Sequence, residues 1–145
     1  MKEINTNLKA LNEIFRNANA GLNSISYVLD EITDKEFRDE ILKEYSGYES
    51  VLKEITEYMK EKGSKIEDVG AFKKCMMKMG IKMNTMFDNS TSHIAELMIK
   101  GTVAGICEIK RILNANNVSD EKTVELCQKL YSLEEEYENS LKKFL

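Results

Sequence analysis

The residues with the clearest potential for chemistry in this sequence are a histidine and a glutamate three positions apart. His93 is the only histidine in the chain, and Glu96 follows it in the segment STSHIAELMIK. Such a pair on a helix can bind a metal ion through an imidazole nitrogen and a carboxylate oxygen. His93 lies beside the apolar stripe of its helix, however, and Glu96 lies well round toward solvent. We therefore expect His93 to be a local hydrogen-bonding or partly buried residue rather than a metal ligand.

Three further acidic residues stand on or beside the apolar stripes of predicted helices. Glu108 and Glu134 fall on the stripes themselves, and Glu44 lies at the edge of its own. A carboxylate in such a position needs partners or a raised pKa, because burial penalises the charged form. Two interpretations stay open. Either solvent reaches these positions at the ends and seams of a bundle, or they form a polar cluster that serves, or once served, a metal site.

A methionine- and lysine-rich segment, residues 72–87, is the third candidate. It contains five of the eight methionines and four lysines, with no acidic residue among them. Methionine-rich faces occur at promiscuous binding surfaces, and basic amphipathic helices can lie on anionic membranes. Phe72, Met76, Met79 and Met83 are therefore candidates for an interaction surface. We favour the alternative, in which this row packs against the rest of the protein and the lysines face solvent.

Other motifs carry little chemistry. Cys75, Cys107 and Cys127 are far apart and lack Cys-x-x-Cys spacing, which favours reduced thiols in a cytosolic protein over disulfides or a thiolate zinc site. The chain has neither a glycine-rich phosphate loop nor a Ser-His-Asp order. Gly101 and Gly105 form Gly-x-x-x-Gly, which we expect to admit a neighbouring helix or a large side chain.

Composition narrows the class of protein. The chain has 145 residues, no proline, 32% charged and 42% hydrophobic residues, which suits a single helical domain covering residues 1–145. The net charge is −4 and only three of the 21 basic residues are arginines, so the chain is a poor nucleic-acid binder. The N-terminal segment has no continuous apolar run, and we expect neither a signal peptide nor a membrane span there.

Five helices are predicted from apolar residues that recur at steps of three and four. Their apolar rows span residues 4–29, 37–59, 69–86, 94–112 and 127–144. Thr33–Glu36 and Ser64–Glu67 are capping boxes, and Ser90 and Ser119 are further N-cap candidates. Gly63 is a plausible left-handed stop after the second helix.

The lengths of these helices predict how they pack. The first, second, fourth and fifth are each about 26 to 30 residues, or roughly 40 to 45 Å, and the third is about 20 residues. Four helices of matched length form a four-helix bundle. The third can then cross along the outside, so that the second and fourth run parallel. A five-helix up-and-down bundle is the alternative, but we prefer the crossover because the third helix is the odd one in length.

Residues scattered over nearly the whole chain match one known pattern. They are Leu11-Asn12 with Asn19-Ala20-Gly21, Lys43-Glu44-Tyr45-Ser46, Val69-Gly70-Ala71-Phe72, and Ile94-Ala95-Glu96 with Lys100-Gly101. With the crossover, they make the chain resemble the ferritin-like superfamily, and more narrowly the small bacterial rubrerythrin-like bundles of unknown function. The resemblance implies an all-α, ferritin-like four-helix bundle with an additional crossover helix.

The resemblance also implies a place for two metal ions. In ferritin-like di-iron proteins, two helices each supply a glutamate and two supply Glu-x-x-His, all pointing inward. Here the two Glu-x-x-His motifs become Glu-x-x-Gly at Glu44 and Glu-x-x-Tyr at Glu134. The other two glutamate positions hold Asn19 and either Leu97 or Gly101. The implied iron or manganese site is thus reduced to a vestige of two carboxylates, Glu44 and Glu134.

These patterns favour a cytosolic, non-catalytic bundle without a cofactor, acting through a protein partner or self-association. We expect Glu44 and Glu134 to face each other without a metal ion, with Tyr48 and Tyr137 as hydroxyl partners. One alternative is a metal-binding or oxidoreductase protein with Glu44 and Glu134 as altered ligands. A second is a membrane-surface binder that uses residues 72–87, which the net negative charge weakens.

Overall fold

The computed structural model describes residues 2–65, 71–115 and 117–145, and every regular element in them is helical. The elements are α1 (Lys2–Val28), the short 3-10 turn η1 (Leu29–Glu31), α2 (Lys35–Glu61), α3 (Ala71–Phe87), α4 (Thr91–Asn114), α5 (Glu121–Leu141) and the 3-10 turn η2 (Lys142–Phe144). The predicted all-α class is confirmed. The side chains of several helical residues, Phe72 and Cys75 among them, lie outside the description.

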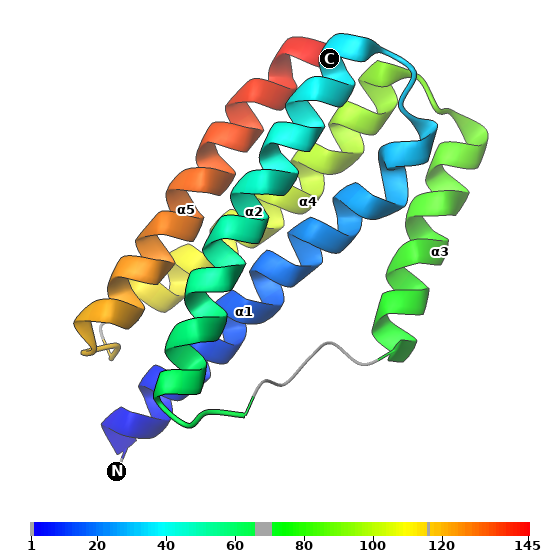
Figure 1. Cartoon of the computed structure of the whole chain (residues 1–145). Helices are drawn as coiled ribbons and strands as arrows, with labels where there is room; N and C mark the ends of the chain where they lie inside the picture. Colours follow the sequence, from blue (N-terminus) through cyan, green and yellow to red (C-terminus); the bar gives the residue numbers. More distant parts are fainter. Residues whose placement is uncertain (1, 66–70, 116) are drawn as a thin grey trace.

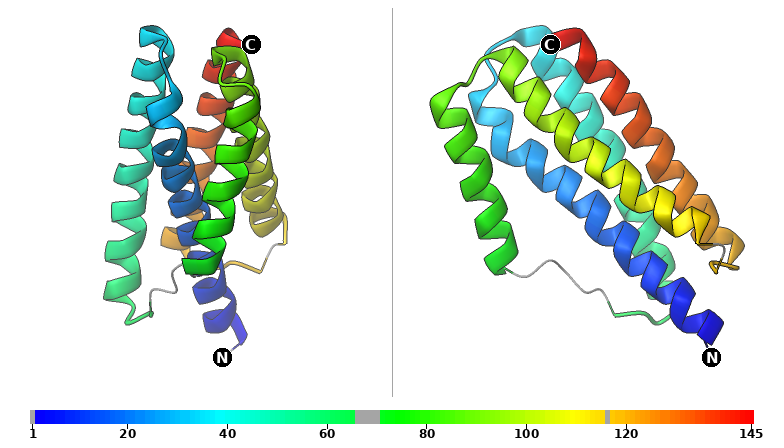
Figure 2. Two further views of the ribbon diagram at one scale, coloured as in Figure 1. Left: turned by 90° about the vertical axis from the view of Figure 1, so that its right-hand side faces the viewer. Right: turned by 180° about the vertical axis from the view of Figure 1, so that it is seen from behind.

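Four of the helices, α1, α2, α4 and α5, pack together as a bundle (Figure 1). Within it α1 packs on α2, α4 on α5 and α2 on α5, while α1 also contacts α4 and α5. The third helix, α3, lies outside this bundle and packs mainly on α1, as a second side of the molecule also shows (Figure 2). It returns the chain along the bundle, so α2 and α4 run in the same direction (Figure 1).

The apolar rows of the bundle helices form the core, as their spacing predicts. In α2, Phe37, Ile41, Ile55 and Met59 are fully buried, because steps of three and four place them on one face of the helix. Phe37 also packs against Phe144 of η2, with ring centroids 4.9 Å apart. Within the described residues, no helix is both long and apolar enough to cross a membrane.

Side chains of three residues cap the starts of α2, α4 and α5. Ser90 caps α4 as predicted, accepting a hydrogen bond from the backbone N–H of His93. The caps of α2 and α5 are each one residue later than predicted: Asp34 accepts from Phe37 N–H, and Asp120 accepts from Thr123 N–H. A carboxylate accepts these hydrogen bonds and also interacts favourably with the positive end of the helix dipole.

Two other predicted helix ends have different outcomes. Gly63 adopts a left-handed φ of +68° directly after α2, as expected for a helix stop. The capping box at Ser64–Glu67 includes residues outside the described part of the chain. The matched lengths hold for α1 and α2, at 27 residues each, whereas α4 has 24, α5 has 21 and α3 has 17.

The favoured prediction for α3 is wrong. Met76, Met79 and Met83 do not pack against the bundle. Their exposed fractions are 55%, 55% and 56%, respectively. The opposite face of α3 packs inward instead, through the buried residues Ile81 and Thr85. Helical periodicity places residues on a common face, but it does not say which face another helix will cover.

Candidate functional site

Glu134 is the most deeply buried acidic residue of the described chain. It enters the bundle from α5 and is only 2% exposed. The Tyr48 hydroxyl of α2 donates a hydrogen bond of 3.1 Å to Glu134 Oε1. Space for the carboxyl comes from α4, where a Cβ added to Gly105 would lie only 2.8 Å from Glu134 Oε2. The glycine therefore lets a carboxyl group lie directly against the helix backbone.

The environment of Glu134 favours its protonated form. Burial, with a smaller contribution from the nearby Glu108, raises the pKa of this carboxyl to about 8, although the hydrogen bond from Tyr48 opposes the shift. Glu134 Oε2 has no hydrogen-bond partner among the described residues. At neutral pH the side chain is therefore mostly a neutral acid with an unmet polar atom.

Glu44 of α2 is also buried, with 4% of its surface exposed. Burial, followed by repulsion from Glu40, raises the pKa of Glu44 to about 7. The Tyr137 ring meets the Tyr48 ring edge to face, with centroids 6.2 Å apart, while its hydroxyl has no hydrogen-bond partner among the described residues. The predicted four-residue cluster is therefore only partly formed, because Tyr48 bonds Glu134 but Tyr137 bonds neither acid.

The donor set does not fit a di-metal centre. No group of three or more His, Cys, Asp or Glu side chains in the described residues could hold a metal ion. Glu44 and Glu134 thus lack the further carboxylates and imidazoles that two metal cations require. His93 and Glu96 do not form a site either, because Glu96 pairs with Lys100 at 3.1 Å, while His93 is half-buried and its Nε2 has no partner in the described chain.

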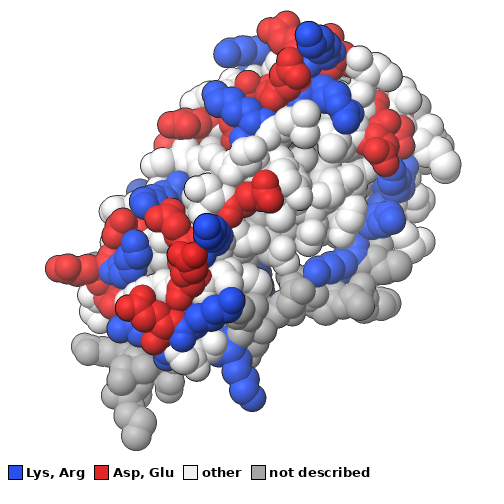
Figure 3. Space-filling view, viewed as in Figure 1, with Lys and Arg blue, Asp and Glu red and all other residues white. Residues whose placement is uncertain are grey.

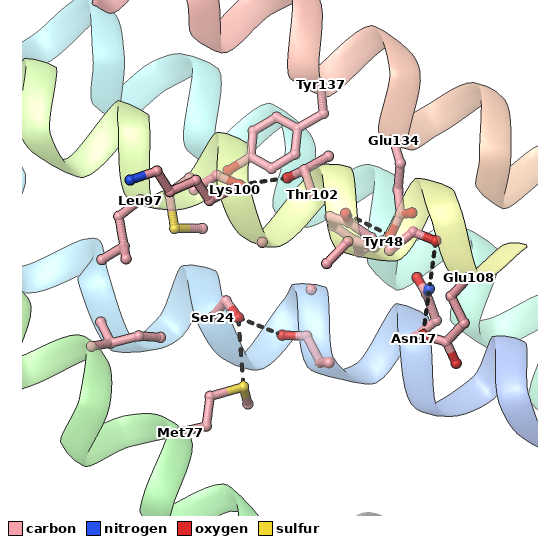
Figure 4. Close-up of a pocket in the computed structure, with 17 residues that line it drawn as sticks. Asn17, Ser24, Tyr48, Met77, Leu97, Lys100, Thr102, Glu108, Glu134 and Tyr137 are labelled. Atoms are coloured by element: carbon pink, nitrogen blue, oxygen red, sulfur yellow. Dashed lines mark hydrogen bonds between the residues drawn. The ribbon is translucent and has the colours of Figure 1, made fainter.

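A cavity of about 540 Å³ lies beside Glu134, between α1, α3 and α4 (Figure 4). Its apolar lining comes from Met77 and Ile81 of α3 and from Leu97 and Met98 of α4. Tyr48, Glu134 and Tyr137 reach it from α2 and α5, while Asn17 and Glu108 meet at one end (Figure 4). The cavity therefore combines apolar walls with a small number of polar groups.

Small residues on α1 and α4 open this cavity. The Cβ of a residue at Gly101 would meet nothing within 4 Å, so the predicted close neighbour at this glycine is absent among the described residues. The prediction is confirmed at Gly105, where an added Cβ would meet the Glu134 side chain, and a similar close approach occurs at Gly21, where an added Cβ would lie 2.5 Å from the Tyr48 ring. Sequence reasoning missed the cavity as a whole. The available signal was the set of small residues in α1 and α4, together with an acid on the α5 stripe.

The outer face of α3, defined by Met76, Met79, Met83 and Met86, is the second candidate site. Met86 is 78% exposed, and steps of three, four and three residues place all four side chains on one face. Basic side chains run along the α3 side of the molecule, whereas acidic and basic residues are mixed over the far ends of α2 and α5 (Figure 3). Phe72, the remaining residue of the predicted interaction surface, has a side chain outside the description.

Cys107 and Cys127 are both free thiols, and neither belongs to the cavity or to the outer face of α3. Cys107 is exposed, whereas burial raises the pKa of Cys127 to about 11.

Comparisons of the chain with known protein families, with curated proteins and with solved structures find no match.

Proposed function

We propose that this chain is a cytosolic, ferritin-like bundle that is not an enzyme and acts by binding a partner protein through the outer face of α3. The observation that carries the proposal is the exposure of Met76, Met79, Met83 and Met86 on one side of one helix. Methionine side chains are flexible and polarizable, so such a face adapts to apolar partners. A contiguous apolar face left in water favours association.

Charge indicates the kind of partner. All four charged residues of α3 are lysines; Lys82 pairs with Glu31 at 3.4 Å, and Lys78 lies exposed next to Met79. The steps between the four methionines are those of a helix-packing seam. The partner that fits this face is therefore an amphipathic helix with an apolar stripe and acidic flanks. Two copies of α3 facing each other would instead bring lysines together.

The ferritin-like assignment is supported by the arrangement of the helices and by the two inward acids. The crossover α3 leaves α2 and α4 parallel, and Glu44 and Glu134 are both buried within the bundle. The free thiols Cys107 and Cys127 are consistent with a reducing compartment. The alternative, a metal-binding or oxidoreductase protein, would need ligands beyond these two glutamates.

Two synthetic helical peptides test the proposed partner. Both carry the same leucine and methionine stripe, but one has glutamates on its flanks and the other has lysines. We expect fluorescence anisotropy to show binding of the acidic peptide. Its affinity should fall as the salt concentration rises, because salt screens the electrostatic attraction. The variant Met79→Gln/Met83→Gln should lose about tenfold or more in affinity. Val103→Gln, which alters an exposed apolar residue on α4, is the matched control.

Three results would contradict the proposal. Equal binding of the two peptides would remove the role of charge. Sedimentation of the protein alone as a dimer that the methionine variant disperses would make a second copy the occupant. Binding to anionic vesicles, abolished by the same variant, would replace the protein partner with a membrane surface.

A further inference from the structure

The cavity between α1, α3 and α4 plays no part in the proposed association. Its volume of about 540 Å³ lies within the range of small-molecule sites in proteins. It lies behind the inward face of α3, since Met77 and Ile81 form part of its wall, and the exposed methionines are on the opposite side of that helix. A ligand there would therefore leave the outer face of α3 uncovered.

Three buried polar atoms of the cavity lining have no hydrogen-bond partner among the described residues: Asn17 Oδ1 and Glu134 Oε2, and the Tyr137 hydroxyl, which can donate or accept. Asn17 is 7% exposed, and its amide N–H donates to the Gly105 carbonyl at 3.1 Å and to Glu108 Oε2 at 3.4 Å. This leaves Asn17 Oδ1 buried without a partner among the described residues, as is Glu134 Oε2. Because buried polar atoms are nearly always hydrogen-bonded, a ligand that satisfies Asn17 Oδ1 and the ionised form of Glu134 must supply donors.

The charge of the lining points the same way. Glu134 and Glu108 both line the cavity and repel each other. Lys100, the basic residue among the described lining residues, pairs with Glu96 at 3.1 Å, and 73% of its side-chain surface is exposed. The end of the cavity near Asn17 therefore carries two carboxyl groups beside the aromatic rings of Tyr48 and Tyr137. No basic residue of the described lining lies at that end, and the positive charges of Arg111 and Arg16 act on Glu108 from outside the lining.

We propose that this cavity binds an organic cation, a protonated amine on an apolar body, with the ammonium group between Glu134, Glu108 and Asn17. An ammonium group supplies three N–H donors and a positive charge, which match the two acids and the free amide oxygen. The apolar body would lie along Met77, Ile81, Leu97 and Met98, where burial removes its surface from water. The aromatic rings at the inner end favour a cation over an anion.

Proton linkage distinguishes this ligand from a neutral one. The titratable groups that act on Glu134 are Tyr48 of α2 and Glu108 of α4. Glu108 in turn is acted on by Glu13 and Arg16 of α1 and by Arg111 of α4. Since the pKa of Glu134 is raised to about 8, amine binding at neutral pH must release its proton. Affinity for an amine should therefore rise as pH increases toward 8. Affinity for a neutral ligand that accepts a hydrogen bond from the protonated acid should fall over the same range.

Three probes of equal chain length test the proposal by isothermal titration calorimetry: n-octylamine, n-octanol and n-octanoate. We expect n-octylamine to bind with one-to-one stoichiometry, n-octanol to bind more weakly, and n-octanoate to give no heat of binding. Glu134→Gln should lower the affinity for n-octylamine by about tenfold or more, as expected when a hydrogen bond to a charged group is lost. Glu108→Gln, at a half-buried position with little effect on packing, is a second variant with the same expected direction.

Cavity-filling substitutions provide the matched control. Gly101→Leu should abolish binding, because Gly101 lines the cavity with nothing within 4 Å of an added Cβ. Gly80→Leu should leave binding unchanged, because Gly80 is equally open but lies outside the cavity. Equal affinity for n-octanol and n-octylamine, tighter binding of n-octanoate, or no binding of any probe to the folded wild-type protein would each overturn the proposal.

Discussion

The second and third helices carry similar rows of large apolar residues, yet the two rows have opposite environments. In α2 the row from Phe37 to Met59 is almost entirely buried, and Tyr48 within it is 1% exposed. In α3 the row of Met76, Met79 and Met83 remains more than half exposed. The difference is one of neighbours, since α2 packs on both α1 and α5, whereas α3 packs mainly on α1.

The comparison separates periodicity from burial. A spacing of three and four residues aligns side chains on a helix, but burial requires a second surface to cover them. For α3, the covered face is the one that contains Ile81 and Thr85, where Thr85 satisfies its hydroxyl by bonding the Ile81 carbonyl at 3.1 Å. The uncovered methionines are then available to a partner, and the inward face contributes to the cavity wall.

The largest expected difference between the two helices is in folding stability. Ile55→Ala removes a fully buried side chain from α2 and should lower the free energy of unfolding by about 2–5 kcal/mol. Met79→Ala removes a mostly exposed side chain from α3 and should change it by no more than about 0.5 kcal/mol. Urea denaturation followed by circular dichroism measures both. A loss at Met79 as large as that at Ile55 would show that α3 is covered in the folded protein.

The buried acid Glu134 should make stability depend on pH. Its pKa is raised from an ordinary value near 4.5 to about 8 on folding, so the folded state binds the proton more tightly than the unfolded state. The protonated Glu134 therefore contributes to the free energy of unfolding, and this contribution is complete at pH values below the unfolded pKa. As the pH rises, the contribution decreases by up to about 1.4 kcal/mol per pH unit until the pH passes 8.

Glu134→Gln isolates that contribution, because the amide keeps the shape and has no proton to lose. We expect the variant to be similar to wild type at pH 5 and more stable than wild type at pH 9, as measured by urea denaturation at each pH. The exposed Glu96, changed to glutamine, is the control and should alter stability by a few tenths of a kcal/mol at most. A parallel pH profile for Glu134→Gln and wild type would rule out a protonated Glu134.

Two glycines test packing on a smaller scale. Gly21→Ala should lower stability by about 1–3 kcal/mol, because the added methyl group would meet the buried Tyr48 ring at 2.5 Å. Gly101→Ala should raise stability by about 0.5–1 kcal/mol, because it adds helix propensity and meets nothing within 4 Å. Thermal unfolding monitored by circular dichroism compares them. Equal effects at the two positions would mean that the cavity beside Gly101 is closed.

The sequence by itself predicted the all-helical class, the five helices, the break before Ser90 and the left-handed Gly63, because these features depend on local periodicity and backbone preference. It also placed Glu44 and Glu134 at inward positions, since both interrupt or adjoin an apolar stripe. Only the tertiary structure decided which face of α3 is covered, that Tyr48 rather than Tyr137 bonds Glu134, and that a cavity opens beside Gly101. Those outcomes depend on how closely helices far apart in the chain approach one another, a distance that no local spacing of residues encodes.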